Sequence, residues 1–176
     1  MKREQLEHLI RAAGAVTGSR RFIVIGSQAI LGQHPRDAPP EALRSREADL
    51  IPIDAPDTAD AISGVLGELS AFDAEYGYHA DGVDLSTATL PEGWRDRLVA
   101  IDNPNTNGYV GLCLDVHDLL ISKYVASREK DREFCRAIAR AGFADRTVLL
   151  KRLESVAIDS VQRSHMIALI DADFAV

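Results

Sequence analysis

Two acidic residues separated by one position carry the clearest chemical signal in this chain of 176 residues. Glu47 and Asp49 lie in Glu47–Ile53, where acidic and apolar residues alternate as in a strand. Because residues two apart in a strand share a face, both carboxylates would project side by side while Ala48 and Leu50 turn toward the core. Like charges so close repel each other unless a cation lies between them, and carboxylate oxygens suit Mg²⁺. The alternative interpretation is an edge strand with a solvated acidic face.

A glycine–serine pair follows an apolar run that predicts a buried strand, Arg21–Ile25. Gly26 would let the backbone approach a phosphate closely. Ser27 would add a hydroxyl beside the free N–H groups at the start of a short helix over Gln28–Gly32. A strand-to-helix turn can also require glycine for packing alone. The pair therefore fits either phosphate binding or a purely structural turn.

A lysine and an aspartate in the second half of the chain complete the chemical set. Lys123 follows the apolar residues Leu119 and Leu120 of a predicted helix. Its aliphatic stem can therefore cross core surface while its ammonium group enters a cleft and neutralises triphosphate charge. Asp131 follows a run of alternating charges, and the plain interpretation of such a run is a solvated helix face.

The elements that must position these residues are predicted by hydrophobic periodicity. Helical spacing appears over residues 2–16 and over Thr58–Leu69, the latter with a buried stripe made of Ile62, Val65, Leu66 and Leu69. Residues 34–40 contain three prolines and are expected to form a loop. Further strands are expected at Tyr78–Leu85, Leu98–Ile101 and Tyr109–Leu114. The last two would form a hairpin through the turn sequence at 103–108.

The segment after Asp115 is predicted to be helical throughout, with helices near residues 115–127, 130–141, 148–156 and 161–174. The expected fold class is α/β (α+β), with a mixed β-sheet flanked by helices and a helical C-terminal half. Residues 1–114 would form the α/β core. Residues 115–176 would pack on that core as part of one compact unit.

Composition limits the partners and the compartment. The net charge of −7 provides no global attraction for nucleic acid or an anionic membrane, and no window approaches the roughly 18 apolar residues of a membrane span. Cys113 and Cys135 lie far apart and lack metal-ligand spacing, which indicates a reducing cytoplasm. Five basic residues would form a local positive rim if they face one cleft, namely Arg44, Arg46, Arg128, Lys130 and Arg132. The alternative is that they are ordinary surface charges.

Taken in order, these motifs resemble the minimal nucleotidyltransferases of the DNA polymerase β-like superfamily, in particular the AbiEii/MenT-like toxins and their bacterial relatives. The family pattern is a glycine followed by glycine or serine opening a helix, an acidic strand, a D-L-x-x-x-K helix and a later basic–Asp pair. The similarity runs from residue 21 to about 143. It rests on Ile25-Gly26-Ser27, Ser45-Arg46-Glu47-Ala48-Asp49, Asp118 to Lys123 and Lys130-Asp131.

The resemblance implies a nucleotidyltransferase-like fold and a division of labour at one cleft. It implies that Gly26, Ser27 and Ser45 bind the nucleotide and that Glu47 and Asp49 hold Mg²⁺. Lys123 would contact the triphosphate, and Asp131 would position the site or an acceptor hydroxyl. The implied reaction moves a nucleoside monophosphate from an NTP to a hydroxyl of a tRNA 3′ end or of a protein. A toxin–antitoxin or defence setting, with a cognate partner protein, is implied as well.

This sequence departs from the family pattern in two respects. Glu47 stands where an aspartate is expected, and the third strand carboxylate of many relatives has no assigned counterpart, with Asp84 and Asp115 as candidates by location. The alternative function is therefore a catalytically degenerate member that binds its partner in the manner of an antitoxin without turnover.

Overall fold

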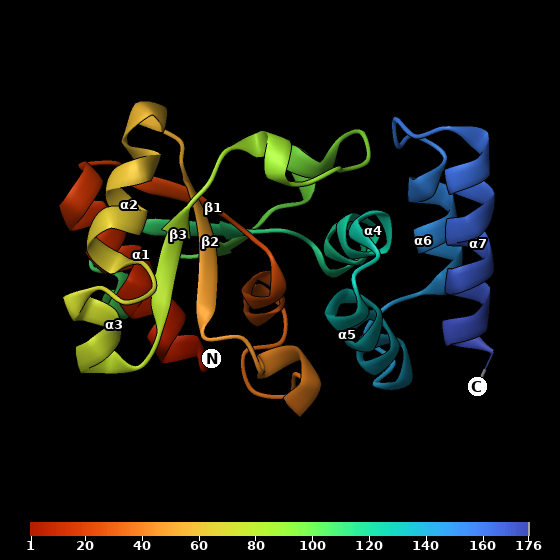
Figure 1. Ribbon diagram of the computed structural model, residues 1–176, viewed down its shortest axis with the longest axis horizontal. Helices are drawn as coiled ribbons and strands as arrows, with labels where there is room; N and C mark the ends of the chain where they lie inside the picture. Colours follow the sequence, from red (N-terminus) through yellow and green to blue (C-terminus); the bar gives the residue numbers. More distant parts are fainter. Residues whose placement is uncertain (176) are drawn as a thin grey trace.

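A five-stranded mixed sheet forms the centre of the molecule (Figure 1). The computed structural model describes residues 1–175. The strand order is β3-β2-β1-β5-β4. The strands are β1 (Arg21–Ile25), β2 (Glu47–Pro52), β3 (His79–Gly82), β4 (Val99–Ile101) and β5 (Val110–Cys113). The antiparallel pairing of β4 with β5 confirms the predicted hairpin.

The pairing of β1 with its two neighbours determines where the chemical residues meet. β1 runs parallel to β5 and antiparallel to β2. The carboxyl ends of β1 and β5 therefore lie at the same edge of the sheet as the amino end of β2. In the register, Ile25 at the end of β1 is the partner of Asp49. This edge brings Gly26, Asp49 and the chain entering the C-terminal helices close together.

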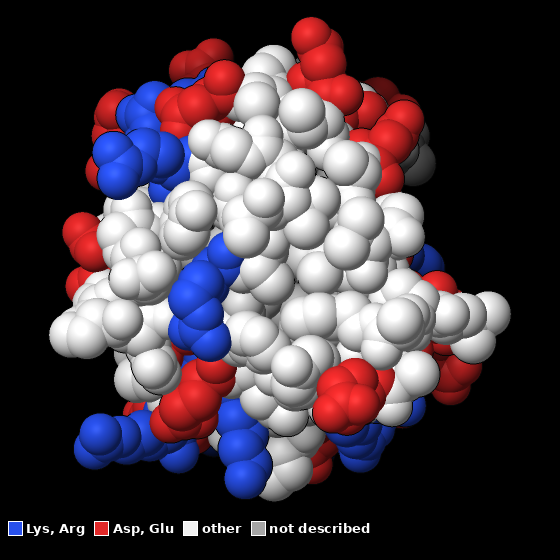
Figure 2. Space-filling model, turned by 90° about the vertical axis from the view of Figure 1, so that its left-hand side faces the viewer, with Lys and Arg blue, Asp and Glu red and all other residues white. Residues whose placement is uncertain are grey.

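Three N-terminal helices cover one face of the sheet, α1 (Arg3–Thr17), α2 (Ala59–Leu66) and α3 (Ala71–Tyr76). Ala48, Leu50 and Ala80 are fully buried on this side. Gly82 lies against the carbonyl oxygen of Ala59 at the start of α2, so a larger residue would separate β3 from the helix. Figure 2 shows the outer surface of these helices, on which charged side chains lie mainly at the margin.

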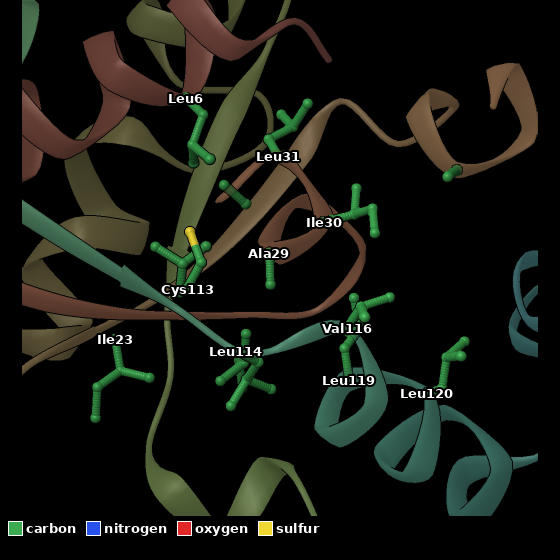
Figure 3. Close-up of a cluster of buried hydrophobic side chains, with 14 of the residues drawn as sticks. Leu6, Ile23, Ala29, Ile30, Leu31, Cys113, Leu114, Val116, Leu119 and Leu120 are labelled. Carbon is green, nitrogen blue, oxygen red and sulfur yellow. The ribbon is translucent and has the colours of Figure 1, made fainter. Parts of the chain in front are cut away.

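A short 3-10 helix, η1 (Ser27–Gly32), anchors the turn after β1 in the core. Ala29, Ile30 and Leu31 are almost completely buried. They lie near Cys113 at the end of β5 and near the first residues of the C-terminal half (Figure 3). The predicted short helix is thus present as a 3-10 helix, and its apolar side chains hold Gly26 and Ser27 in place.

The C-terminal half is helical, as predicted, and consists of α4 (Val116–Ala126), α5 (Glu129–Arg140), α6 (Arg146–Leu153) and α7 (Ser160–Phe174). α4 and α5 lie next to the sheet edge, and α6 and α7 form the far end of the molecule (Figure 1). The mixed sheet, its flanking helices and this helical half confirm the expected α/β (α+β) class. Among the helices of residues 1–175, none is long and apolar enough to cross a membrane.

Two local predictions were wrong. The predicted helix Thr58–Leu69 ends at Leu66, and a separate helix, α3, begins after Ser70. Val65 and Leu69, expected in the buried stripe, are 51% and 92% exposed. The strand expected at Tyr78–Leu85 is also too long, because β3 ends at Gly82. The loop expected at residues 34–40 is confirmed, and a 3-10 turn, η2 (Pro40–Leu43), begins at its last residue. The other 3-10 turns are η3 (Pro56–Thr58), η4 (Leu85–Thr87), η5 (Trp94–Arg97) and η6 (Pro104–Thr106).

Candidate active site

Asp49 is held in an electrostatically unfavourable position. Glu47 and Asp49 project from the face of β2 opposite the buried Ala48 and Leu50, as the alternation predicted. Burial, together with the neighbouring charges of Glu47 and Asp81, raises the pKa of Asp49 to about 7 against the opposing effect of Lys123. An additional cation beside Asp49 would relieve this repulsion.

Gly26 makes room for the Asp49 carboxylate. Its backbone has φ +67° and ψ −170°, a conformation essentially restricted to glycine. A Cβ atom built on Gly26 would overlap Asp49 Oδ2. The glycine predicted to admit a phosphate therefore also admits the carboxylate of the neighbouring strand.

Lys123 connects the glycine–serine turn to the C-terminal helices. Its Nζ donates hydrogen bonds to Ser27 Oγ and Asp131 Oδ1, both at 3.1 Å, and lies 4.4 Å from the centroid of the Phe134 ring. Arg128 Nε donates to Asp131 Oδ2 at 2.6 Å. Burial alone would raise the pKa of Asp131, but the Arg128 and Lys123 cations hold that pKa below its usual range.

Asp131 is therefore not part of a solvated helix face, which was the plain interpretation of its sequence context. It is fully buried at the start of α5. The alternating-charge pattern did not predict the burial of Asp131, because its neighbours Lys130 and Arg132 are at least partly exposed, as the pattern suggests.

Ser45 organises the entry to β2. Its hydroxyl accepts a hydrogen bond from the Glu47 backbone N–H at 3.1 Å. Its carbonyl accepts hydrogen bonds from Gln28 Nε2 at 3.1 Å and from the amino group of Met1 at 3.0 Å. These contacts tie the acidic strand to η1 and to the N-terminus.

A cleft of about 380 Å³ lies where these elements meet. Every residue to which a site role was assigned from the sequence lines it, namely Gly26, Ser27, Ser45, Glu47, Asp49, Lys123 and Asp131. Of the predicted basic rim, Arg44, Arg128 and Lys130 line the cleft. The other two arginines do not, because Arg46 pairs with Asp73 at 2.8 Å and Arg132 with Asp173 at 3.4 Å.

The two candidates for a third carboxylate lie outside this cleft lining. Asp84 accepts a hydrogen bond from the Ser86 backbone at 2.7 Å. Asp115 caps α4 and pairs with Arg152 and His117, which hold its pKa far below the usual range despite the opposing effect of burial. Sequence reasoning missed Asp81, the register partner of Asp49 on β3, whose charge acts on Asp49 although Asp81 also lies outside the cleft lining. Only the strand pairing, which the sequence pattern does not specify, identifies it.

Asp118 of the D-L-x-x-x-K motif has a structural role. It is fully buried and accepts two hydrogen bonds from Arg97, at 2.9 and 3.1 Å. Arg152 forms an ion pair with it at 2.9 Å. Asp118 thus joins α4 to η5 and α6.

Glu47 and Asp49 fit a hydrated Mg²⁺ ion that is shared with a substrate. Within residues 1–175, no group of three or more His, Cys, Asp or Glu side chains is arranged to hold a metal ion unaided. Mg²⁺ in phosphoryl-transfer sites commonly takes only one or two carboxylates, with water and phosphate oxygens completing its shell. The raised pKa of Asp49 marks the place where a cation would be stabilised.

The mixed sheet thus carries a glycine–serine turn and a pair of carboxylates into one cleft, where they meet a lysine from α4. The chain belongs to the family described as nucleotidyltransferase of unknown function (DUF6036), whose model matches residues 4–170. No curated protein and no solved structure matches the chain significantly.

Proposed function

We propose that the protein transfers a nucleoside monophosphate from Mg·NTP to an acceptor hydroxyl in the 380 Å³ cleft. The observation that carries this proposal is the meeting of opposite charges there. Glu47 and Asp49 enter from the sheet, and Lys123 enters from α4 to contact Ser27. A triphosphate with its cation needs both signs of charge at close range.

In the proposed reaction, the acceptor oxygen forms a bond to the α-phosphorus of the NTP. The bond from this phosphorus to the oxygen that bridges to the β-phosphate breaks, pyrophosphate leaves with the electron pair, and the hydroxyl proton passes to solvent. Mg²⁺ held by Glu47 and Asp49 would supply positive charge to the phosphate oxygens.

The side chains of the cleft have separate tasks in this proposal. Lys123 and Arg128 bind phosphate oxygens, and Ser27 orients Lys123 through its hydroxyl. Asp131 is a positioning residue, because it holds both cations at the same place. Most of the catalytic effect would come from positioning and charge stabilisation rather than covalent chemistry.

The acceptor is proposed from the resemblance to AbiEii/MenT-like toxins, and is the 3′ end of a tRNA or a protein hydroxyl. The same resemblance motivates the proposal of a toxin–antitoxin or defence setting with a cognate partner. Glu47 favours a second candidate function, binding without turnover, because its side chain is one methylene longer than the expected aspartate and Mg²⁺ demands near-ideal ligand geometry.

The test is incubation of the protein with each α-³²P-labelled NTP, Mg²⁺ and bacterial total RNA or protein. Asp49→Asn serves as the site variant and Asp60→Asn, at an exposed position of α2, as the matched control. Label transferred by the wild type and the control but lost in Asp49→Asn is the expected result. Binding of Mg·NTP without transfer of label would favour the second candidate, and absence of binding would refute both.

A further inference from the structure

A second hollow, of about 400 Å³, adjoins the nucleotide cleft between η2 and α5. Both hollows are lined by Glu41, Arg44 and Glu133, so a ligand in one can reach the other. Arg44 and Glu133 form an ion pair of 3.0 Å at this junction, and both side chains are exposed. Figure 1 shows α5 beside the turn that follows the loop of residues 34–40.

The hollow is built by one stripe of α5. Glu133, Arg136, Ala137, Arg140 and Ala141 line it, and their spacing of three and four residues places them on one side of the helix. Ala137 and Ala141 are small, which leaves an open floor. The exposed side chains of Arg136 and Arg140 stand along it.

The charge of this groove is opposite to that of the molecule. Arg44, Arg136 and Arg140 face the two acids Glu41 and Glu133, and Glu133 is already paired with Arg44. The groove thus carries a local excess of positive charge on a chain whose net charge is −7. Guanidinium groups spaced along an open channel suit successive phosphates of a nucleic acid backbone.

We infer that the η2–α5 groove, lined by Arg44, Arg136 and Arg140, is a binding site for the phosphodiester backbone of a single-stranded RNA. This inference rests on the proposed function, because the groove would deliver the strand's terminal hydroxyl to the nucleotide cleft. Arg44 at the junction would exchange its Glu133 partner for a phosphate of the strand. An acidic protein is the rival ligand, but its carboxylates lack the regular spacing of a polynucleotide backbone.

The experiment measures binding of a fluorescein-labelled oligoadenylate RNA to the full chain by anisotropy, without nucleotide. We expect Arg136→Glu/Arg140→Glu to weaken binding by about tenfold or more. The slope of the logarithm of the association constant against the logarithm of the salt concentration should become less steep by about 1.4, because two phosphate contacts are lost. Arg36→Glu/Lys151→Glu changes the net charge equally at exposed positions outside the groove and should retain near-wild-type affinity. Arg136→Lys/Arg140→Lys should retain most of the binding, which separates lost charge from a folding defect.

Equal losses in both glutamate double variants, or no RNA binding by the wild type, would overturn the inference. Tighter binding of a labelled polyglutamate peptide than of the RNA, with the same sensitivity to Arg136 and Arg140, would overturn it in favour of an acidic protein. Mg·NTP binding is measured separately on the same variants. Its absence in the wild type refutes the proposed function, whereas intact Mg·NTP binding without RNA binding refutes the groove alone.

Discussion

Asp49 illustrates how a residue can lie where its charge lowers the stability of the folded protein. It lies among the acidic groups Glu47 and Asp81 and near one cation, Lys123. A sequence under selection for stability alone would replace such a carboxylate with a neutral side chain. The missing side chain of Gly26 makes room for this carboxylate, and the proposed function gives the unfavourable charge a purpose, which is to hold the cation of a ligand.

The first prediction concerns the pH dependence of stability without Mg²⁺. Because the folded-state pKa of Asp49 is raised to about 7, its ionisation destabilises the folded protein increasingly as pH rises from the unfolded pKa, near 4, toward 7. Asp49→Asn removes this effect and should raise the free energy of unfolding by about 4 kcal/mol at pH 8, since each pKa unit corresponds to about 1.4 kcal/mol. Urea unfolding in EDTA at several pH values measures it.

At pH 4 the advantage of Asp49→Asn over the wild type should disappear, because Asp49 is then protonated in the folded state. An advantage of the same size at pH 4 and pH 8 would mean that charge is not its cause. Added Mg·NTP should stabilise the wild type and leave the variant unchanged.

A second residue-scale prediction separates the two demands on Gly26. Gly26→Ala should destabilise the protein by about 1–3 kcal/mol through its backbone conformation and should also abolish Mg·NTP binding, because the new methyl group displaces the Asp49 carboxylate. Gly18→Ala is the matched control, since Gly18 also has a positive φ of +73° but no atom within 4 Å of the added Cβ. It should lose about 1 kcal/mol of stability and retain binding. Thermal unfolding and equilibrium nucleotide binding check both variants, and retained binding by Gly26→Ala would contradict the prediction.

At the scale of elements, periodicity specified which segments are helices and strands better than where they end. The apolar run Arg21–Ile25 and the alternation in Glu47–Ile53 correspond to β1 and β2 because their side chains are buried in the expected pattern. The helix expected over Thr58–Leu69 failed because Leu69 fits a helical stripe in spacing but adopts φ +65° at the break before α3. Apolar residues at helical spacing do not reveal where a helix ends when the last of them, here Leu69, is exposed to solvent.

The placement of candidate site residues was predictable where chemistry and spacing coincide within one element. Glu47 and Asp49 share a strand, so a two-residue spacing was enough to place them. Asp81 and Asp118 were beyond such reasoning, because their roles depend on strand register and on arginines distant in sequence. Asp131 is buried rather than exposed because of contacts between elements, which the spacing of residues within one element does not reveal.

The third prediction compares two buried aspartates on neighbouring helices. Asp118→Ala and Asp131→Ala each leave two cations without their carboxylate, and each should cost about 3 kcal/mol of stability. Their effects on Mg·NTP binding should differ. Asp118→Ala should bind normally when folded, because its partners Arg97 and Arg152 lie outside the cleft lining, whereas Asp131→Ala should bind at least tenfold more weakly. Binding measured at 10 °C, where both variants can remain folded, makes the comparison, and equal losses of affinity would contradict it.

At the scale of the whole molecule, the cleft belongs to neither half of the chain alone. Gly26, Ser27 and Asp49 come from the sheet and its turn, whereas Lys123 and Asp131 come from the helical half. Leu114 and Val116 at the junction belong to the same buried cluster as Ile30 of η1 (Figure 3). We therefore expect residues 1–114 and the helical region to unfold together.

The two free cysteines test this expectation because they lie in different parts of the molecule. Cys113 is in β5 and Cys135 is in α5, and both are completely buried. Each becomes reactive toward a thiol reagent only when its surroundings open. In Cys135→Ala and Cys113→Ala, the remaining thiol should become reactive at the same urea concentration at which that variant loses its helical circular dichroism. Exposure of Cys135 at clearly lower urea would show that the helical region opens first. A saturating Mg·NTP concentration should then move both thiol midpoints upward together, because a ligand held by both halves stabilises only the state in which they are joined.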